Sequence, residues 1–275
     1  MTDAILTAVR RVREKRPLVH AITNIVTAND CANIVLAAGG AAIMAQDERE
    51  VEEITASSAA LALNMGALRA QEAMLLAARE AKRLGHPVVL DPVAAGASRL
   101  RGEMCSHLLA DGLVSVVRGN VSELRALAAG KGQEGGVEAS ALDRVTEENL
   151  AESAAWLQDF SRRTGVVALM TGALDLITDG KRTAVLRGGS ALLRRITGAG
   201  CMLTSLTAAC CGANPDTLLE AAAAAAGVMK VCGEQAERRV REEMEGTASF
   251  RTRLIDAVSR LTDDELAEGL RIELL

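Results

Sequence analysis

The most informative stretch of the sequence is Ser190-Ala-Leu-Leu-Arg-Arg-Ile-Thr-Gly-Ala-Gly-Cys-Met-Leu-Thr-Ser-Leu-Thr207. Its apolar run from Ala191 to Ile196 predicts a strand that ends at Thr197, and a helix-compatible run begins at Cys201. A glycine-containing turn between a strand and a helix leaves several backbone N–H groups unpaired, and the helix dipole adds about half a positive charge there. We interpret Gly198-Ala199-Gly200-Cys201 as an anion hole with a thiol at its edge. An ordinary tight turn beside a buried cysteine is the alternative.

Length and composition limit the classes of protein that this chain can belong to. The 275 residues are 49% hydrophobic and contain one tryptophan, two phenylalanines and no tyrosine. A core of small aliphatic side chains suits parallel sheets covered by helices. Binders of single-stranded nucleic acids use aromatic platforms and a basic surface, whereas this chain carries a net charge of −5. We therefore expect no nucleic-acid partner.

Cysteine spacing and the N-terminus bear on the compartment. The cysteines are Cys31, Cys105, Cys201, Cys210, Cys211 and Cys232. None forms a CxxC pair, so neither a zinc site nor a disulfide framework is indicated. The first residues are charged and lack the apolar core of a signal peptide, and no apolar run reaches the roughly 18 residues of a membrane span. We expect a soluble, cytoplasmic protein with no membrane partner.

Apolar runs alternate with helix-periodic segments along most of the chain. Strands are predicted at 17–22, 41–44, 59–64, 87–91, 113–118 and 166–170, and a hairpin at 174–186 turns through Asp179-Gly180. Everything after position 200 is predicted to be helical. This pattern indicates an α/β fold in which a mostly parallel sheet has helices on both faces and a few antiparallel strands. We expect residues 1–275 to form a single domain.

One further motif matches a known pattern but lies in the wrong structural context. Residues 130–145 are rich in Gly and Glu and predict an exposed loop. They contain a GxGxxG match from Gly130 to Gly135, but it follows a predicted helix rather than a strand, so it does not indicate a dinucleotide site.

Polar residues follow the predicted strands where each strand ends. These residues are Asn24, Asp91, Arg118, Asn120, Thr171 and 198–201. Ligands of such sheets bind outside the carboxyl ends of the strands, so we expect these groups to meet at one edge. An anion hole, an arginine and acidic groups suit phosphoryl transfer, although the GxxxxGKS/T motif is absent.

Two carboxylates are candidates for Mg²⁺, held through water molecules: Asp91 and Glu123. Each has a simpler interpretation. Asp91 precedes Pro92 and can form a turn, and Glu123 sits where a helix dipole favours a carboxylate. Arg118 can likewise belong to a salt bridge.

Several motifs together resemble the hydroxyethylthiazole kinase family, which has a ribokinase-like fold. They are His20-Ala-Ile-Thr-Asn24 with Asn29, Asp91-Pro92-Val93, Arg118-Gly-Asn-Val-Ser-Glu123, Thr171-Gly172 and Thr197-Gly-Ala-Gly-Cys-Met-Leu-Thr204. The resemblance covers nearly the whole chain, and the motifs are specific in combination. The spacing of Asn120 and Glu123 also resembles a magnesium motif of the wider ribokinase-like group.

The resemblance implies ATP-dependent phosphorylation of the primary alcohol of 4-methyl-5-(2-hydroxyethyl)thiazole in thiamine salvage. It also implies a homotrimer with substrate sites at the subunit interfaces. The implied site residues are Met44, Asn24, Gly66 and Gly198 for the thiazole; Arg118, Thr171 and Asn120 for ATP; Asp91 and Glu123 for Mg²⁺; and Gly198, Ala199, Gly200 and Cys201 for catalysis.

Cys201 stands where related sugar kinases have an aspartate that acts as general base. A helix N-terminus can lower the pKa of a thiol, so Cys201 is a candidate base, or it only shapes the pocket. Other interpretations stay open at this point. They are another ribokinase-like enzyme, such as a hydroxymethylpyrimidine kinase or a repair dehydratase for hydrated NAD(P)H, and a non-catalytic nucleotide-binding sensor.

Overall fold

The computed structural model describes residues 1–129 and 144–275, and these residues form one nine-stranded sheet. The strands are β1 (Leu18–Ile22), β2 (Ala41–Ile43), β3 (Ala60–Asn64), β4 (Val88–Asp91), β5 (Val116–Asn120), β6 (Val167–Thr171), β7 (Asp175–Thr178), β8 (Thr183–Leu186) and β9 (Ile272–Leu274). Their order in the sheet is β2-β1-β3-β4-β5-β6-β7-β8-β9. The first six strands are parallel, and β7, β8 and β9 each run antiparallel to the preceding neighbour. The predicted α/β class and the 174–186 hairpin are confirmed.

Strand register aligns the polar strand ends with one another. Asn64 at the end of β3 pairs with Asp91 at the end of β4. Asn120 at the end of β5 pairs with Thr171 at the end of β6. Side-by-side residues in neighbouring strands lie within about 5 Å, so the register alone brings these side chains close.

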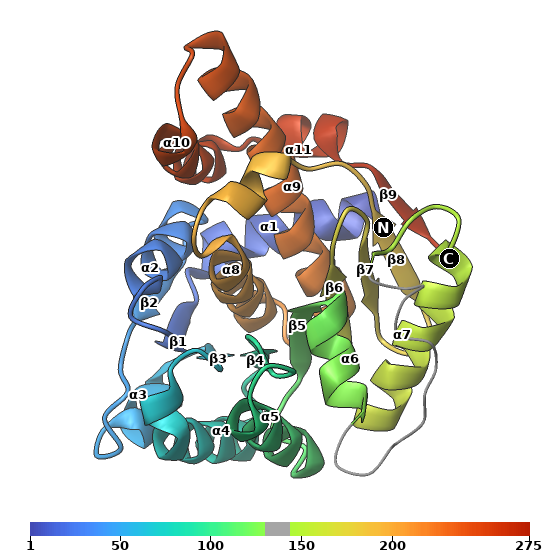
Figure 1. Ribbon diagram of the computed structural model, residues 1–275. Coiled ribbons are helices and arrows are strands. Elements are labelled where there is room, and N and C mark those ends of the chain that lie inside the picture. Colours follow the sequence, from blue (N-terminus) through green and yellow to red (C-terminus); the bar gives the residue numbers. More distant parts are fainter. Residues whose placement is uncertain (130–143) are drawn as a thin grey trace.

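Helices cover both faces of the sheet (Figure 1). One face carries α1 (Thr2–Lys15), α2 (Ala28–Ala37), α8 (Ala199–Ala213), α9 (Leu218–Glu242), α10 (Thr247–Arg260) and α11 (Asp263–Gly269). The other carries α3 (Val51–Ser57), the 3₁₀ turn η1 (Leu68–Ala70), α4 (Gln71–Leu84), α5 (Arg99–Ala110), α6 (Val121–Ala129) and α7 (Leu150–Thr164). The sheet thus separates two apolar cores.

Small side chains let the central helices approach the sheet closely. All six alanines from Ala221 to Ala226 in α9 are 0% exposed. The neighbouring α8 is buried along almost its whole length, from Met202 to Cys211. Alanine also has the highest helix propensity, so the same residues favour the helix and its close packing. This packing fixes the position of the α8 N-terminus against the ends of the strands.

Two sequence-based expectations about secondary structure are wrong. The run from Ala191 to Ile196 is not a strand: it forms a 3₁₀ segment, η2 (Ala191–Arg195), capped by the Ser190 hydroxyl, which accepts from the Leu192 N–H at 3.0 Å. The C-terminal end is not entirely helical, because β9 pairs with β8. The apolar side chains of 191–196 pack on the core that contains α9 instead of pairing with a strand.

Helix α8 begins at Ala199, two residues before the predicted start at Cys201. The predicted loop at 130–145 and its GxGxxG match fall largely outside the described residues. Among the described residues, no helix combines the length and hydrophobicity that crossing a bilayer requires.

Candidate active site

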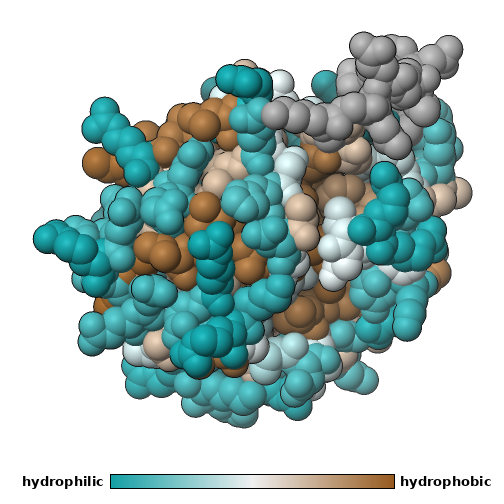
Figure 2. All heavy atoms as spheres, turned by 90° about the horizontal axis from the view of Figure 1, so that it is seen from below, coloured by the Kyte–Doolittle hydropathy of each residue, from teal (hydrophilic) through white to brown (hydrophobic). Residues whose placement is uncertain are grey.

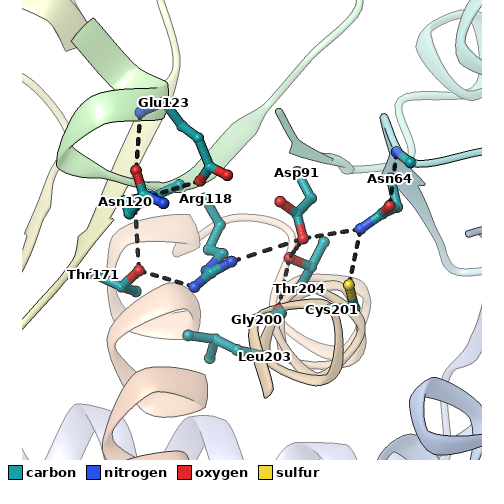
Figure 3. Close-up of polar contacts among 12 residues, drawn as sticks. Asn64, Asp91, Arg118, Asn120, Glu123, Thr171, Gly200, Cys201, Leu203 and Thr204 are labelled. Carbon is teal, nitrogen blue, oxygen red and sulfur yellow. Dashed lines mark hydrogen bonds and ion pairs between the residues drawn. The ribbon is translucent and has the colours of Figure 1, made fainter. Parts of the chain in front are cut away.

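A chain of hydrogen bonds and one ion pair connects the carboxyl ends of the parallel strands (Figure 3). It begins at Asn24, just after β1, whose Nδ2 donates to Asn64 Oδ1 at 3.1 Å. Asn64 Nδ2 in turn donates to Asp91 Oδ2 at 3.0 Å. These contacts span β1, β3 and β4, so they confirm that the polar strand ends meet at one edge.

Arg118 continues the chain from β4 to β6. Its Nη1 lies 3.7 Å from Asp91 Oδ2, and its Nη2 donates to Thr171 Oγ1 at 2.9 Å. The side chain is only 13% exposed and that of Asp91 only 1%. The ion pair that the sequence left open for Arg118 is therefore present, and it lies inside the candidate site.

Asn120 and Glu123 form a reciprocal cap at the start of α6. Asn120 Oδ1 accepts from the Glu123 N–H, and Glu123 Oε2 accepts from the Asn120 N–H, both at 2.9 Å. Glu123 Oε1 also accepts from the Ala94 N–H at 3.2 Å, which ties the segment after β4 to α6. The helix-start role of Glu123 is thus observed, and the carboxylate is held beside Asp91 by backbone donors.

The N-terminus of α8 faces this chain of side chains. Gly198 is the N-cap residue with φ of 87°, a left-handed conformation that favours glycine. A Cβ at Gly198 would lie 2.7 Å from Thr27 Cγ2, so the position is also crowded. At Gly200 an added Cβ would overlap with Arg118 Nη1. The N–H groups of Ala199, Gly200 and Cys201 occupy the first turn, where the helix offers them no acceptor. Although the preceding strand is absent, the glycine turn and the helix start predicted for the anion hole are present.

Cys201 receives two amide donors. Asn64 Nδ2 lies 3.2 Å and Asn24 Nδ2 3.5 Å from its Sγ. Burial and the nearby Asp91 charge nevertheless raise the pKa of the Cys201 thiol. Burial and the Asp91 charge thus oppose thiolate formation at Cys201, against the lowering of the pKa that a helix start favours.

Asp91 is the most deeply buried charged group of the site. Burial raises its pKa to about 6, although the Arg118 cation opposes this and the Thr204 hydroxyl donates to Oδ2 at 2.9 Å. The other oxygen, Oδ1, is buried and has no hydrogen-bond partner. A buried carboxylate oxygen without a donor is costly and is typical of a place where a cation or a substrate proton binds.

A pocket of about 910 Å³ opens beside these groups. Its lining includes Arg118, Asn120, Thr171, Ala199, Gly200, Gly188, Gly189 and Lys230. An arginine side chain together with a helix start suits a polyanionic ligand such as a nucleotide phosphate.

The described residues contain no cluster of three or more His, Cys, Asp or Glu side chains able to hold a metal ion. A Mg²⁺ ion usually binds one or two carboxylates and completes its shell with water and phosphate oxygens. The pairing of Asp91, with its unpartnered Oδ1, and Glu123 fits such a hydrated ion.

The residues expected to bind the thiazole lie less close together. Gly66 packs directly on Asn24 and Asn64, and its N–H donates to Asn64 Oδ1 at 2.9 Å. Met44 lies beyond the end of the edge strand β2, is 36% exposed, and belongs to none of the contacts described above.

Two members of the site were not predicted from the sequence: Asn64 and Thr204. Asn64 contacts Asn24, Gly66, Asp91 and Cys201 at once. The sequence feature that could have identified Asn64 is its place as the polar residue at the end of an apolar run, as for Asp91. Thr204 lies four residues after Gly200, so one turn of α8 brings its hydroxyl to Asp91.

Comparison with known proteins identifies the family. A profile of the hydroxyethylthiazole kinase family matches residues 9–264. This chain belongs to the hydroxyethylthiazole kinase family. The enzyme of that name from Clostridium acetobutylicum is 44% identical over 264 residues, covering 95% of this chain and 96% of the relative. The one from Methanocella arvoryzae is 41% identical over 263 residues, covering 95% and 94%.

Solved structures agree with this assignment. The hydroxyethylthiazole kinase of Pyrococcus horikoshii superposes with a TM-score of 0.86 at 33% identity, covering 98% of each chain. A ribokinase-like superfamily protein from Enterococcus faecalis matches with a TM-score of 0.62 at 11% identity, over 94% of this chain and 93% of that one, which shows a shared fold. The predicted ribokinase-like fold is confirmed. Hydroxyethylthiazole kinases phosphorylate their thiazole alcohol in thiamine salvage, so the chain is a kinase rather than a sensor or a dehydratase.

Proposed function

We propose that this chain, acting as one kinase domain over residues 1–275, transfers the γ-phosphoryl group of ATP to the primary hydroxyl of 4-methyl-5-(2-hydroxyethyl)thiazole. One observation supports this assignment of roles. The glycine turn at the N-terminus of α8 lies against Arg118, and Arg118 pairs with Asp91 at the strand ends. Phosphoryl transfer depends mainly on positioning and on stabilising charge at the oxygens of the transferred group. Each residue's role follows from that requirement.

The N–H groups of Ala199, Gly200 and Cys201 hold the oxygens of the transferring group, with Gly198 next to the attacking hydroxyl. Arg118 and Thr171 bind ATP phosphates from the opposite side, and their mutual bond at 2.9 Å keeps the guanidinium pointing toward Gly200. Asn120 lines the same pocket and keeps Glu123 in place. Charge-assisted hydrogen bonds, such as those from Arg118 to a phosphate, are about twice as strong as hydrogen bonds between neutral groups.

Asp91 and Glu123 would hold Mg²⁺, whose chemistry is to neutralise phosphate charge and align the phosphates. The unpartnered Oδ1 of Asp91 supports this assignment. Glu123 is oriented by the Ala94 and Asn120 N–H groups, so its free lone pairs remain available for water ligands of the ion.

Cys201 shapes the acceptor end of the pocket, and a thiolate base is not required. Its thiol is held by Asn24 and Asn64. In a loose phosphoryl-transfer transition state the bond to the attacking alcohol oxygen has barely formed, so the alcohol keeps its proton until late and gains little from a general base. The proton leaves to solvent or to a phosphate oxygen.

The thiazole would contact Asn24, Gly66 and Gly198, with Met44 reaching it in a homotrimer whose sites lie between subunits. Large apolar side chains directly after Asn24 support such an interface: Ile25 is 92% exposed and Val26 73%. In the view from below, hydrophobic residues also appear between hydrophilic ones at the surface (Figure 2). All six cysteines are free, as is usual in the reducing cytoplasm, and we infer that location.

An ADP-release assay with the thiazole alcohol, with and without Mg²⁺, tests the proposal. We expect ADP formation that requires both, with the phosphate ester identified by mass spectrometry. ADP release with a hydroxymethylpyrimidine but not with the thiazole would assign the chain to the other kinase. ATP binding without turnover of any alcohol would contradict the proposal.

A further inference from the structure

The loop after β8 makes an unusual turn at the wall of the pocket. Gly188 and Gly189 both have positive φ, 85° and 93°. Both residues are glycines, which adopt this left-handed conformation without the steric penalty that other residues meet. Both glycines, with Ser190 and Ala191, line the 910 Å³ pocket, so the shape of this turn is also the shape of the pocket wall.

Two side chains one turn apart on α9 hold the turn. Lys230 Nζ donates to the Gly188 carbonyl at 3.0 Å. Glu234 Oε1 accepts from the Gly189 N–H at 2.7 Å. Residues four apart lie on the same face of a helix, so Lys230 and Glu234 bind the carbonyl and the N–H of the single peptide group that joins Gly188 to Gly189. We call Lys230, Glu234 and Asp175 the α9 clamp.

Asp175 extends the clamp to the other wall segment. Lys230 Nζ lies 3.4 Å from Asp175 Oδ2 and 3.5 Å from the Ala173 carbonyl. Asp175 Oδ1 accepts from the Gly172 N–H at 2.9 Å. Gly172 follows Thr171, which bonds Arg118, so the clamp is connected through one peptide to the phosphate-binding side chains.

The hydrogen-bond donors of Lys230 are all used within the protein. An ammonium group has three N–H donors. Gly188, Ala173 and Asp175 take all three, and the side chain is only 9% exposed. Lys230 therefore has no donor left for a ligand, although it lines the pocket. Its charge is compensated by Asp175 rather than by phosphate.

We propose that the α9 clamp consists of positioning residues that set nucleotide affinity by fixing the wall at 172–175 and 188–191, without contacting the transferred phosphoryl group. The inference rests on the proposed function, because it takes the pocket as the ATP site. It predicts a change in ATP binding and in the ATP KM, with the transfer step largely unchanged once ATP is bound.

The test is calorimetric titration of ATP into the full chain without any alcohol, followed by steady-state kinetics. We expect Lys230→Met to weaken ATP binding at least tenfold, because it leaves the Asp175 charge buried and unpaired. At saturating ATP, kcat should stay within about threefold of wild type. The double variant Lys230→Met with Asp175→Asn should recover part of the ATP affinity, because it leaves no unpaired charge buried at position 175.

Lys82→Met is the matched control. Lys82 also donates to a backbone carbonyl, that of Asp111, but it lies on α4. Its loss should leave ATP affinity unchanged. A second pair keeps the test usable if Lys230→Met does not fold: Glu234→Ala removes the acceptor for Gly189, whereas Glu234→Gln retains one. Only the alanine variant should bind ATP more weakly.

Unchanged ATP affinity in both Lys230→Met and Glu234→Ala would overturn the proposal. A fall in kcat at unchanged affinity would also overturn it, because it would make Lys230 a catalytic residue. If wild type binds ATP but phosphorylates no thiazole, the proposed function fails while the affinity comparison stays valid. If wild type binds no ATP, both fail.

Discussion

Gly200 and Arg118 are so close that a Cβ on Gly200 would overlap with the Arg118 Nη1 atom. The glycine lets the guanidinium lie across the first turn of α8, beside its N–H groups. A positive side chain and a helix start thus point to the same volume, which is the requirement for binding a phosphoryl group.

Gly200→Ala should therefore abolish most kinase activity while leaving the fold intact. Alanine is a better helix former than glycine by about 1 kcal/mol, so the helix itself gains. The guanidinium must move, and the charge-assisted contact to phosphate is lost. We expect kcat/KM for ATP to fall by about 100-fold, or about 2.7 kcal/mol, with an unchanged circular dichroism spectrum.

Gly246→Ala is the control, because a Cβ there would meet no atom within 4 Å. It should have wild-type activity. Wild-type activity in Gly200→Ala would show that Arg118 is not needed at the position seen here.

Asn64→Ala should lower both stability and turnover. The variant removes a donor to the buried Asp91 carboxylate and one to the Cys201 sulfur. Hydrogen bonds to charged groups are worth about 1.5–3 kcal/mol, and we expect the free energy of unfolding in urea to fall by about 2 kcal/mol. Asn33→Ala, on the exposed side of α2, should change it by less than about 0.5 kcal/mol. An equal effect at both positions would contradict the central role of Asn64.

Cys201→Asp should keep or increase turnover. The Asn24 and Asn64 amides that now face Sγ are suited to a carboxylate, and the raised thiol pKa means that little thiolate is present to lose. The measurement is kcat at saturating ATP and alcohol. Loss of nearly all turnover would show that a thiolate takes the alcohol proton.

Stability should decrease in mild acid through His20. This side chain is fully buried, with Nε2 donating to the Ala45 carbonyl at 2.9 Å and Nδ1 accepting from the Thr55 hydroxyl at 2.8 Å. Burial lowers the pKa of His20, so the unfolded chain binds the proton more readily. The stabilisation is present above about pH 6.5 and is lost as pH falls toward the folded pKa.

Urea unfolding at pH 7.5 and 5.5 checks this expectation. His20→Gln should be less stable overall but should show a smaller loss between the two pH values than wild type. His107→Gln, on the exposed part of α5, should keep the wild-type difference. The same loss in His20→Gln and wild type would assign the acid sensitivity to other groups.

The sequence was a good guide where local pattern and tertiary contacts agree. Buried apolar runs such as 88–91 and 167–171 became strands, and the polar residue that ends each, Asp91 or Thr171, lies at the site edge. It misled at 191–196, where an apolar run has the same pattern whether it joins a sheet or covers a helix. The pattern alone does not decide between them: in the structure β9, from nearly 90 positions along the chain, pairs with β8, and 191–196 packs on the core that contains α9.

Side-chain partners were harder to predict than positions. Asn64 and Thr204 are ordinary residues in sequence, and their importance comes from the β3–β4 register and the placement of α8. The α9 clamp was missed for the same reason: Lys230 lies inside an alanine-rich helix, and its partners come from 173–175 and 188.

The polar chain at the strand ends draws its members from positions 24 to 204, and none of its links between strands is local in sequence. Contacts between residues far apart in sequence form late in folding, because the entropy of closing the loop between them is lost before the contact stabilises the chain. During refolding from urea, catalysis should accordingly reappear after helical circular dichroism has recovered. Intermediates that already contain helices would bind no substrate, so regained turnover would report completion of the whole sheet rather than of any one part.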